Sequence, residues 1–114
     1  MVFASMKKDK FAVRQDMRRR RDAMSLDDVL NLSRAVEDRL FACKDFSVCQ
    51  NIMFVLSFGN EVRTDEMIKR SLKDRKQVYV PRMMIRERRL EVCEITDMDQ
   101  EFELGAFDIR EPSR

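Results

Sequence analysis

A nearly continuous apolar segment in the middle of the chain limits the fold more than any other feature of the sequence. The apolar run, from Ile52 to Leu56, is the end of a predicted strand over Val48–Leu56, and it stops abruptly at Ser57. An apolar run of this kind is typical of a strand that is buried on both faces, which favours a parallel sheet. A helical pattern begins at Thr64, and a second apolar strand follows over residues 77–80. The pattern strand, helix, strand predicts a βαβ unit over residues 48–81.

The remaining segments complete a single predicted α/β domain over residues 1–114. Two helices are expected over residues 7–43, the second of them capped by Ser25, and a third strand is expected over residues 89–96. Residues 97–114 read as an acidic, loop-like tail. The second helix is expected to bury Leu26, Val29, Leu30, Val36 and Leu40, and the helix that Thr64 caps to bury Met67, Ile68 and Leu72.

Only part of a typical α/β sheet is expected from these strands, so we predict an incomplete domain. A truncated sheet exposes an apolar edge, and we expect such an edge to promote self-association unless the tail covers it.

Charge and cysteine content exclude several classes of protein. Charged residues make up 39% of the chain, yet the net charge is only +2, because the excess of cations is concentrated in residues 6–21. No apolar run approaches the ~18–20 residues that cross a membrane. The three cysteines are odd in number and the chain has no histidine. This composition disfavours a zinc site or a cysteine nucleophile and predicts reduced thiols in a cytoplasmic protein.

The segment after the first strand is the best candidate for ligand binding. Gly59 and Asn60 allow a tight turn, and Glu61 lies between the end of a strand and the start of a helix, where open α/β sheets bind ligands. Its carboxylate can accept two parallel hydrogen bonds from a heterocycle with adjacent N–H groups. An exposed loop glutamate is the alternative. Leu56 and its apolar neighbours Met53 and Phe58 either line a pocket beside Glu61 or belong to the core.

A second candidate site lies in the first helix. Lys10 and Arg14 are four residues apart, so they share one helical face, and two cations near a helix N-terminus suit a phosphate. A solvated basic face is the alternative. The run Arg18–Arg21 points around the helix and is typical of a solvated face with one or two ion pairs. Nucleic-acid binding is disfavoured, because the chain lacks an aromatic stacking platform. The residues alone therefore predict binding of an anionic or nucleotide-like ligand.

Several short motifs in this order resemble the 5-formyltetrahydrofolate cyclo-ligase family, also called methenyltetrahydrofolate synthetases. The resemblance covers about Lys8 to Pro112, and its motifs are Lys10-x-x-x-Arg14, Leu56-Ser57-x-x-x-Glu61-Val62-x-Thr64, Val78-x-Val80-Pro81-Arg82 and Ile109-x-Glu111-Pro112. It implies a three-layer α/β sandwich of the phosphosugar isomerase and CoA transferase type, with a mostly parallel sheet.

The resemblance also implies an activity and a set of ligands. Members convert 5-formyltetrahydrofolate to 5,10-methenyltetrahydrofolate with ATP and Mg²⁺ in one-carbon metabolism. Carried over to this chain, Lys10 and Arg14 would contact the ATP phosphates. Leu56 would contact the folate through its apolar side chain, and Glu61 would bind it by hydrogen bonds.

Two departures from the family qualify this expectation. Arg63 stands where the family usually has an acidic residue. The family also continues past the Glu-Pro element with a strand and a Gly-rich loop that holds triphosphate and metal, and this chain has neither. We therefore expect the 114-residue chain alone to be inactive, with its metal ligands in the absent part. The alternative is a non-catalytic folate- or nucleotide-binding module that lacks the phosphate loop.

Overall fold

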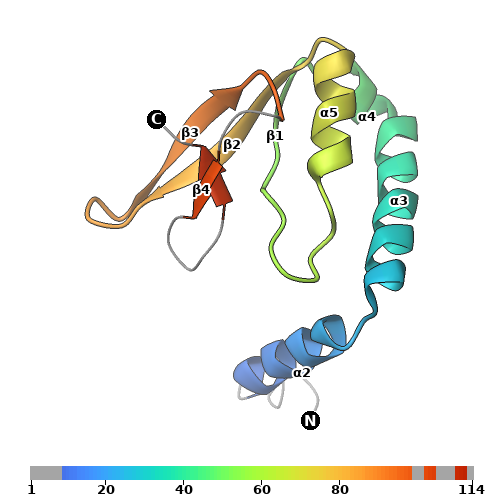
Figure 1. Cartoon of the computed structure of the whole chain (residues 1–114), viewed down its shortest axis with the longest axis vertical. Helices are drawn as coiled ribbons and strands as arrows, with labels where there is room; N and C mark the ends of the chain where they lie inside the picture. The colour runs from blue at the N-terminus through green and yellow to red at the C-terminus, as the bar shows by residue number, and fades with distance from the viewer. Residues whose placement is uncertain (1–8, 99–101, 105–109, 113–114) are drawn as a thin grey trace.

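A computed structural model describes residues 9–98, 102–104 and 110–112. Its elements, in chain order, are helices α2 (Lys10–Asp22), α3 (Leu26–Ala42) and α4 (Lys44–Val48), strand β1 (Asn51–Met53), helix α5 (Asp65–Lys73), and strands β2 (Gln77–Met84), β3 (Arg89–Ile95), β4 (Phe102–Leu104) and β5 (Arg110–Pro112) (Figure 1).

The main sheet has the strand order β1-β2-β3 and is mixed rather than mostly parallel. Strands β1 and β2 are parallel, with Ile52 opposite Val78, and α5 connects them, which confirms the predicted βαβ unit. Strand β3 is antiparallel to β2, with Pro81 opposite Val92. The connection from β2 to β3 spans only residues 85–88, whereas a crossover to a parallel strand needs about a dozen residues or more. A hairpin is therefore the only geometry available to it.

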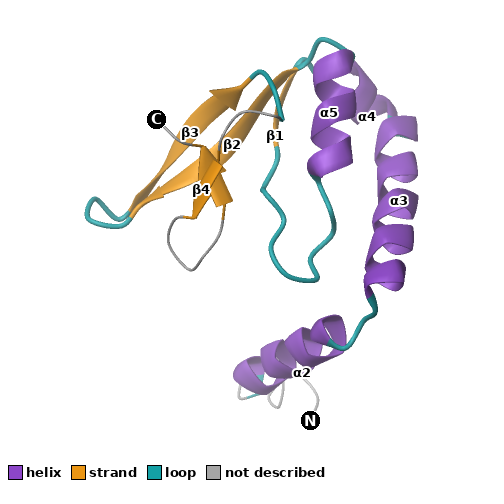
Figure 2. Cartoon of the chain, viewed as in Figure 1, coloured by secondary structure: helices purple, strands orange, loops and turns teal. Residues whose placement is uncertain are grey.

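The hydrophobic core lies between this sheet and helices α4 and α5 (Figure 2). The sheet contributes Val78, Val80 and Ile95, each at most 1% exposed, and α5 contributes Met67 and Ile68 as predicted. Phe46, Phe54 and Leu56 complete the buried cluster. In the part of the chain that the structure describes, the helices that build this core lie on one side of the sheet. A second helical layer stays a prediction of the resemblance.

The opposite face of the β2–β3 hairpin presents apolar side chains to solvent. Met83 lies opposite Leu90 in the register, and Pro81 lies opposite Val92. Leu90 and Val92 are 56% and 58% exposed, whereas Ile95 on the other face is buried. This confirms the predicted alternation along the third strand. It also leaves an apolar sheet surface that no described element covers.

Several elements differ from the sequence prediction. Val48 belongs to the short helix α4, so β1 begins only at Asn51, and it ends at Met53 rather than at Leu56. Strand β2 continues through Pro81 to Met84 rather than ending before it. Beyond Tyr79, β2 has no partner in β1, so within the described residues this side of β2 is an edge of the main sheet. Proline, which has no N–H to donate, is tolerated at such an edge. The predicted loop-like tail contains the antiparallel pair β4–β5, and β5 lies against β2.

Helix α3 begins as predicted but buries less than predicted. The Ser25 hydroxyl oxygen accepts a hydrogen bond from the Asp28 N–H at 3.1 Å, which confirms the cap. Of the predicted stripe only Val29 is buried, and Leu40 is half-buried. Leu26, Leu30 and Val36 are 61%, 48% and 44% exposed, which contradicts the prediction. The reason is that α3 packs chiefly on α4 rather than on the sheet, so most of its apolar stripe has no described partner.

Candidate functional site

The side chain of Asn60 joins the loop between β1 and α5 to the end of helix α2. Its amide nitrogen donates to the backbone carbonyls of Arg21 at 2.8 Å and Met24 at 3.0 Å. The last carbonyls of a helix have no partner within the helix, so an external donor is valuable there. None of the α2 side chains is buried, and Asn60 is therefore a principal attachment of this helix. The sequence marked Asn60 only as a turn residue, and nothing local predicted its distant partners.

Two further hydrogen bonds fix the C-terminal part of the same loop. The Thr64 hydroxyl donates to the Val55 carbonyl at 2.6 Å, and the Arg63 N–H donates to the Ser33 hydroxyl oxygen at 2.9 Å. Thr64 precedes α5 as predicted, but its side chain makes no capping bond. Thr64 is only 7% exposed, and its hydroxyl instead satisfies a backbone acceptor at the end of the β1 segment.

Glu61 closes a tight turn that begins at Phe58. The Glu61 N–H donates to the Phe58 carbonyl at 3.1 Å, and the Phe58 N–H donates to Oε1 of Glu61 at 2.8 Å. Gly59 has φ +56°, a left-handed conformation in which a side chain is strained. The turn thus holds the carboxylate in a fixed place. Each carboxylate oxygen can accept more than one hydrogen bond, so Glu61 keeps acceptor capacity for a ligand.

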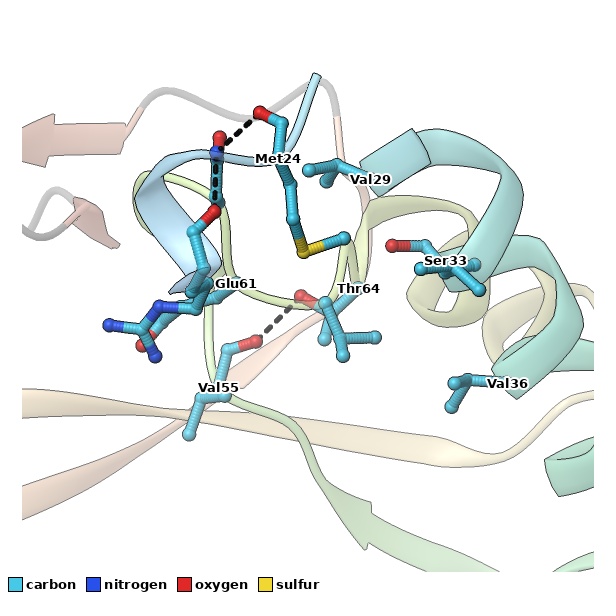
Figure 3. A pocket seen from close by; sticks show the side chains of 11 residues that line it. Met24, Val29, Ser33, Val36, Val55, Glu61 and Thr64 are labelled. Atoms are coloured by element: carbon cyan, nitrogen blue, oxygen red, sulfur yellow. Dashed lines mark hydrogen bonds between the residues drawn. The ribbon is translucent and has the colours of Figure 1, made fainter. Parts of the chain in front are cut away.

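A pocket of about 470 Å³ lies beside this turn. Figure 3 shows Glu61 on one side of it, the α3 side chains Val29, Ser33 and Val36 on the other, and Met24 between them. Most of its lining is apolar; the complete set is Arg21, Met24, Val29, Leu32, Ser33, Val36, Val55, Asn60, Glu61, Val62 and Thr64. A mostly apolar cavity with a few polar groups is typical of small-molecule sites. Of the α3 stripe that periodicity predicted for the core, Val29 and Val36 lie in the wall of this pocket.

The other predicted site residues lie in different surroundings. Leu56 is 3% exposed and belongs to the hydrophobic core under the loop, not to the pocket lining. Met53 and Phe58 are 46% and 49% exposed and do not line the pocket either. Of the predicted substrate-binding pair, only Glu61 is at the pocket.

Lys10 and Arg14 are exposed on α2, one helical turn apart and outside the pocket lining. No ion pair joins either of them to another residue in the described ranges. They are therefore available to an anion. The described residues contain no group of three or more acidic or cysteine side chains that could hold a metal ion.

The described residues form a mixed α/β domain with a mostly apolar pocket beside the loop between β1 and α5. The model of the 5-formyltetrahydrofolate cyclo-ligase family matches residues 6–114, and the chain belongs to this family. This confirms the family that the motifs indicated. Within residues 9–98, 102–104 and 110–112, no helix is long and apolar enough to cross a membrane.

A solved structure has the same fold. The NMR structure of 5,10-methenyltetrahydrofolate synthetase from Aquifex aeolicus matches with a TM-score of 0.78 and 20% sequence identity. The match covers 93% of this chain and 53% of the Aquifex chain. The chain therefore spans about half the length of the solved protein that it matches.

Proposed function

We propose that this chain forms the folate-binding side of an ATP-dependent 5-formyltetrahydrofolate cyclo-ligase. The supporting observation is the position of Glu61, a family motif residue that a turn holds at the side of a mostly apolar pocket. The chain spans about half of the Aquifex synthetase, so the complete reaction is proposed for the family's full active site. The three cysteines form no disulfide, which is compatible with a cytoplasmic protein.

Glu61 would orient the folate. The flat heteroaromatic ring of the folate would lie between the α3 wall and the loop, and its edge N–H groups would donate to the Glu61 carboxylate. Direct apolar contact between Leu56 and the folate is proposed from the resemblance. In its present position Leu56 supports the loop from the core side.

Lys10 and Arg14 would bind the ATP phosphates. The two residues are exposed and one helical turn apart, so both side chains could donate charge-assisted hydrogen bonds to the same phosphate chain. In the family scheme the formyl oxygen takes the terminal phosphoryl group, which releases ADP. Atom N10 then attacks the formyl carbon, phosphate leaves, and N10 loses its proton. This chain would orient the folate through Glu61 and the phosphates through the α2 cations Lys10 and Arg14.

Calorimetric titration of 5-formyltetrahydrofolate tests the role of Glu61. We expect Glu61→Gln to weaken binding about tenfold or more, because a hydrogen bond to a charged group contributes about 1.5–3 kcal/mol. The substituted amide keeps an acceptor for the Phe58 N–H, so the turn is retained. Glu87→Gln, in the exposed β2–β3 connection, is the control and should bind like the wild type. Equal affinities of Glu61→Gln and the wild type would remove Glu61 from the site.

A turnover assay separates binding from catalysis. With ATP and Mg²⁺, we expect the 114-residue polypeptide by itself to form no 5,10-methenyltetrahydrofolate, which is followed by its near-ultraviolet absorbance. Turnover at a normal enzymatic rate would contradict the half-site proposal. A non-catalytic binding module would also bind without turnover. An in-frame Gly-rich phosphate loop in the coding sequence after Arg114 would favour the enzyme over the module.

A further inference from the structure

The four consecutive arginines of α2 divide into two different pairs. Asp16 binds Arg19 at 3.0 Å and Arg20 at 3.1 Å, each across about one turn of the helix. The hydrogen bond from Arg19 holds the pKa of the Asp16 carboxyl below its usual value. Arg18 and Arg21 have no ion pair with any residue in the described ranges. The arginine run predicts one or two ion-paired members, and in the structure these are Arg19 and Arg20.

The two arginines without an ion pair share a helical face with the predicted phosphate-binding residues. Lys10, Arg14 and Arg18 follow at intervals of four, and Arg21 follows three residues later. At 3.6 residues per turn these positions form one row, which is roughly 16 Å long from Cα to Cα. Like charges at such spacings destabilise a helix by a few tenths of a kcal/mol per pair. A row of four unpaired cations is thus unfavourable unless an anion lies along it.

The row ends at the pocket that contains Glu61. Arg21 is the member that lines this pocket. Its backbone carbonyl accepts the 2.8 Å hydrogen bond from the Asn60 amide, so the end of the row is fixed next to the loop. The three other members lie progressively farther from the pocket along α2.

We propose that Arg18 and Arg21 extend the Lys10–Arg14 site into one row that binds the polyphosphate chain of a nucleotide. Arg21 would contact the terminal phosphate, the one nearest to the pocket. This inference rests on the proposed function, in which Lys10 and Arg14 bind ATP. The direction of the row brings the terminal phosphate toward the folate, and the planar guanidinium of Arg21 can bind it through two parallel hydrogen bonds.

Two double variants that have the same net charge as each other test the row. Both R18Q/R21Q and R19Q/R20Q remove two positive charges from the same helix, and glutamine has a helix propensity close to that of arginine. Calorimetric titration with inorganic tripolyphosphate and with ATP is the measurement. We expect R18Q/R21Q to weaken binding at least tenfold and R19Q/R20Q to weaken it less than threefold. We expect R18K/R21K to bind with intermediate affinity, because lysine keeps the charge and loses the bidentate geometry.

The possible results separate the row from the function on which it depends. Equal losses in the two double variants would show a nonspecific charge effect and overturn the row. If the wild type binds tripolyphosphate and ATP and R18Q/R21Q binds them equally well, the row is overturned. The ATP site at Lys10 and Arg14 would then stand. Absence of any wild-type binding would overturn both. Complete displacement of tripolyphosphate by random-sequence RNA, with a steep salt dependence, would identify a general polyanion surface and likewise overturn the row. Circular dichroism of each variant confirms that α2 is retained.

Discussion

The amide of Asn60 and the backbone carbonyl of Arg21 are 2.8 Å apart, although 39 residues separate them in the chain. This hydrogen bond holds the helix that carries the basic row against the loop that carries Glu61. The two halves of the proposed site therefore depend on one side chain for their relative position.

We expect Asn60→Asp to detach helix α2 from the loop. The substitution replaces the donor with an oxygen that faces backbone carbonyls, and the loss of a bond to a half-buried group costs about 1–3 kcal/mol. Urea denaturation measures the loss of stability, and limited trypsin digestion at Arg18–Arg21 reports the detachment. Asn31→Asp, on the exposed side of α3, is the matched control and should change neither measurement. Unchanged protease resistance of the Asn60 variant would contradict the attachment.

We expect Arg75→Gly to stabilise the protein by roughly 0.5–1 kcal/mol. Arg75 follows α5 with φ +64°, a conformation that glycine adopts without strain. The Arg75 N–H donates to the Leu72 carbonyl and the Lys76 N–H to the Ser71 carbonyl, both at 3.0 Å, which is the hydrogen-bond pattern of a Schellman helix end. The rise should appear as a higher urea midpoint. Arg86→Gly, at an exposed position without positive φ, should give no gain.

We expect Lys76→Met to lower the free energy of unfolding by about 2–4 kcal/mol. Lys76 is 7% exposed, and its ammonium group donates to the carbonyls of Phe46 at 3.0 Å and Ser47 at 3.1 Å, and to that of Cys49. Methionine preserves the apolar stem but leaves the acceptors at the end of α4 without this donor. Lys73→Met, at an exposed position in α5, is the control for urea denaturation. Equal stabilities of the two variants would refute the capping role of Lys76.

We expect the isolated chain to self-associate through its uncovered sheet surface and Val92→Lys to reduce this. Val92 is 58% exposed on the apolar face of β3, where a charge opposes contact between apolar surfaces. Light scattering over a range of protein concentrations measures the average mass. Glu94→Gln changes the charge on the same face by the same amount and removes no apolar area, so it should associate like the wild type. A wild-type chain that stays monomeric at all concentrations would contradict this expectation.

Local signals predicted the elements of the fold well, because their causes lie within a few residues. The Ser25 cap, the amphipathic face of α5 and the alternation along β3 are all short-range features, and the structure has each of them. The βαβ unit followed from the same signals. The motif order was sufficient to predict the family, which the family match confirmed.

The candidate site was only partly predictable, because its residues come from distant segments. Glu61 was identified from its position after a strand, and the structure has it at a pocket. Val29 and Val36, which amphipathicity assigned to the core, lie in the wall of that pocket, because periodicity identifies an apolar face but not what covers it. Whether Lys10 and Arg14 bind phosphate stays a prediction.

The sequence by itself determined most of the helices and strands, with α4 and the β4–β5 pair as the exceptions. It also determined which carboxylate follows the first strand, since backbone propensity, capping and periodicity act between neighbours. Only the tertiary structure decided that Lys76 is buried, that Pro81 lies within a strand and that Asn60 binds the end of α2. Each of these depends on which backbone groups lack a partner after the chain has folded. A hydrogen bond or a sheet edge that arises between segments some 30 residues apart leaves no mark in the local sequence.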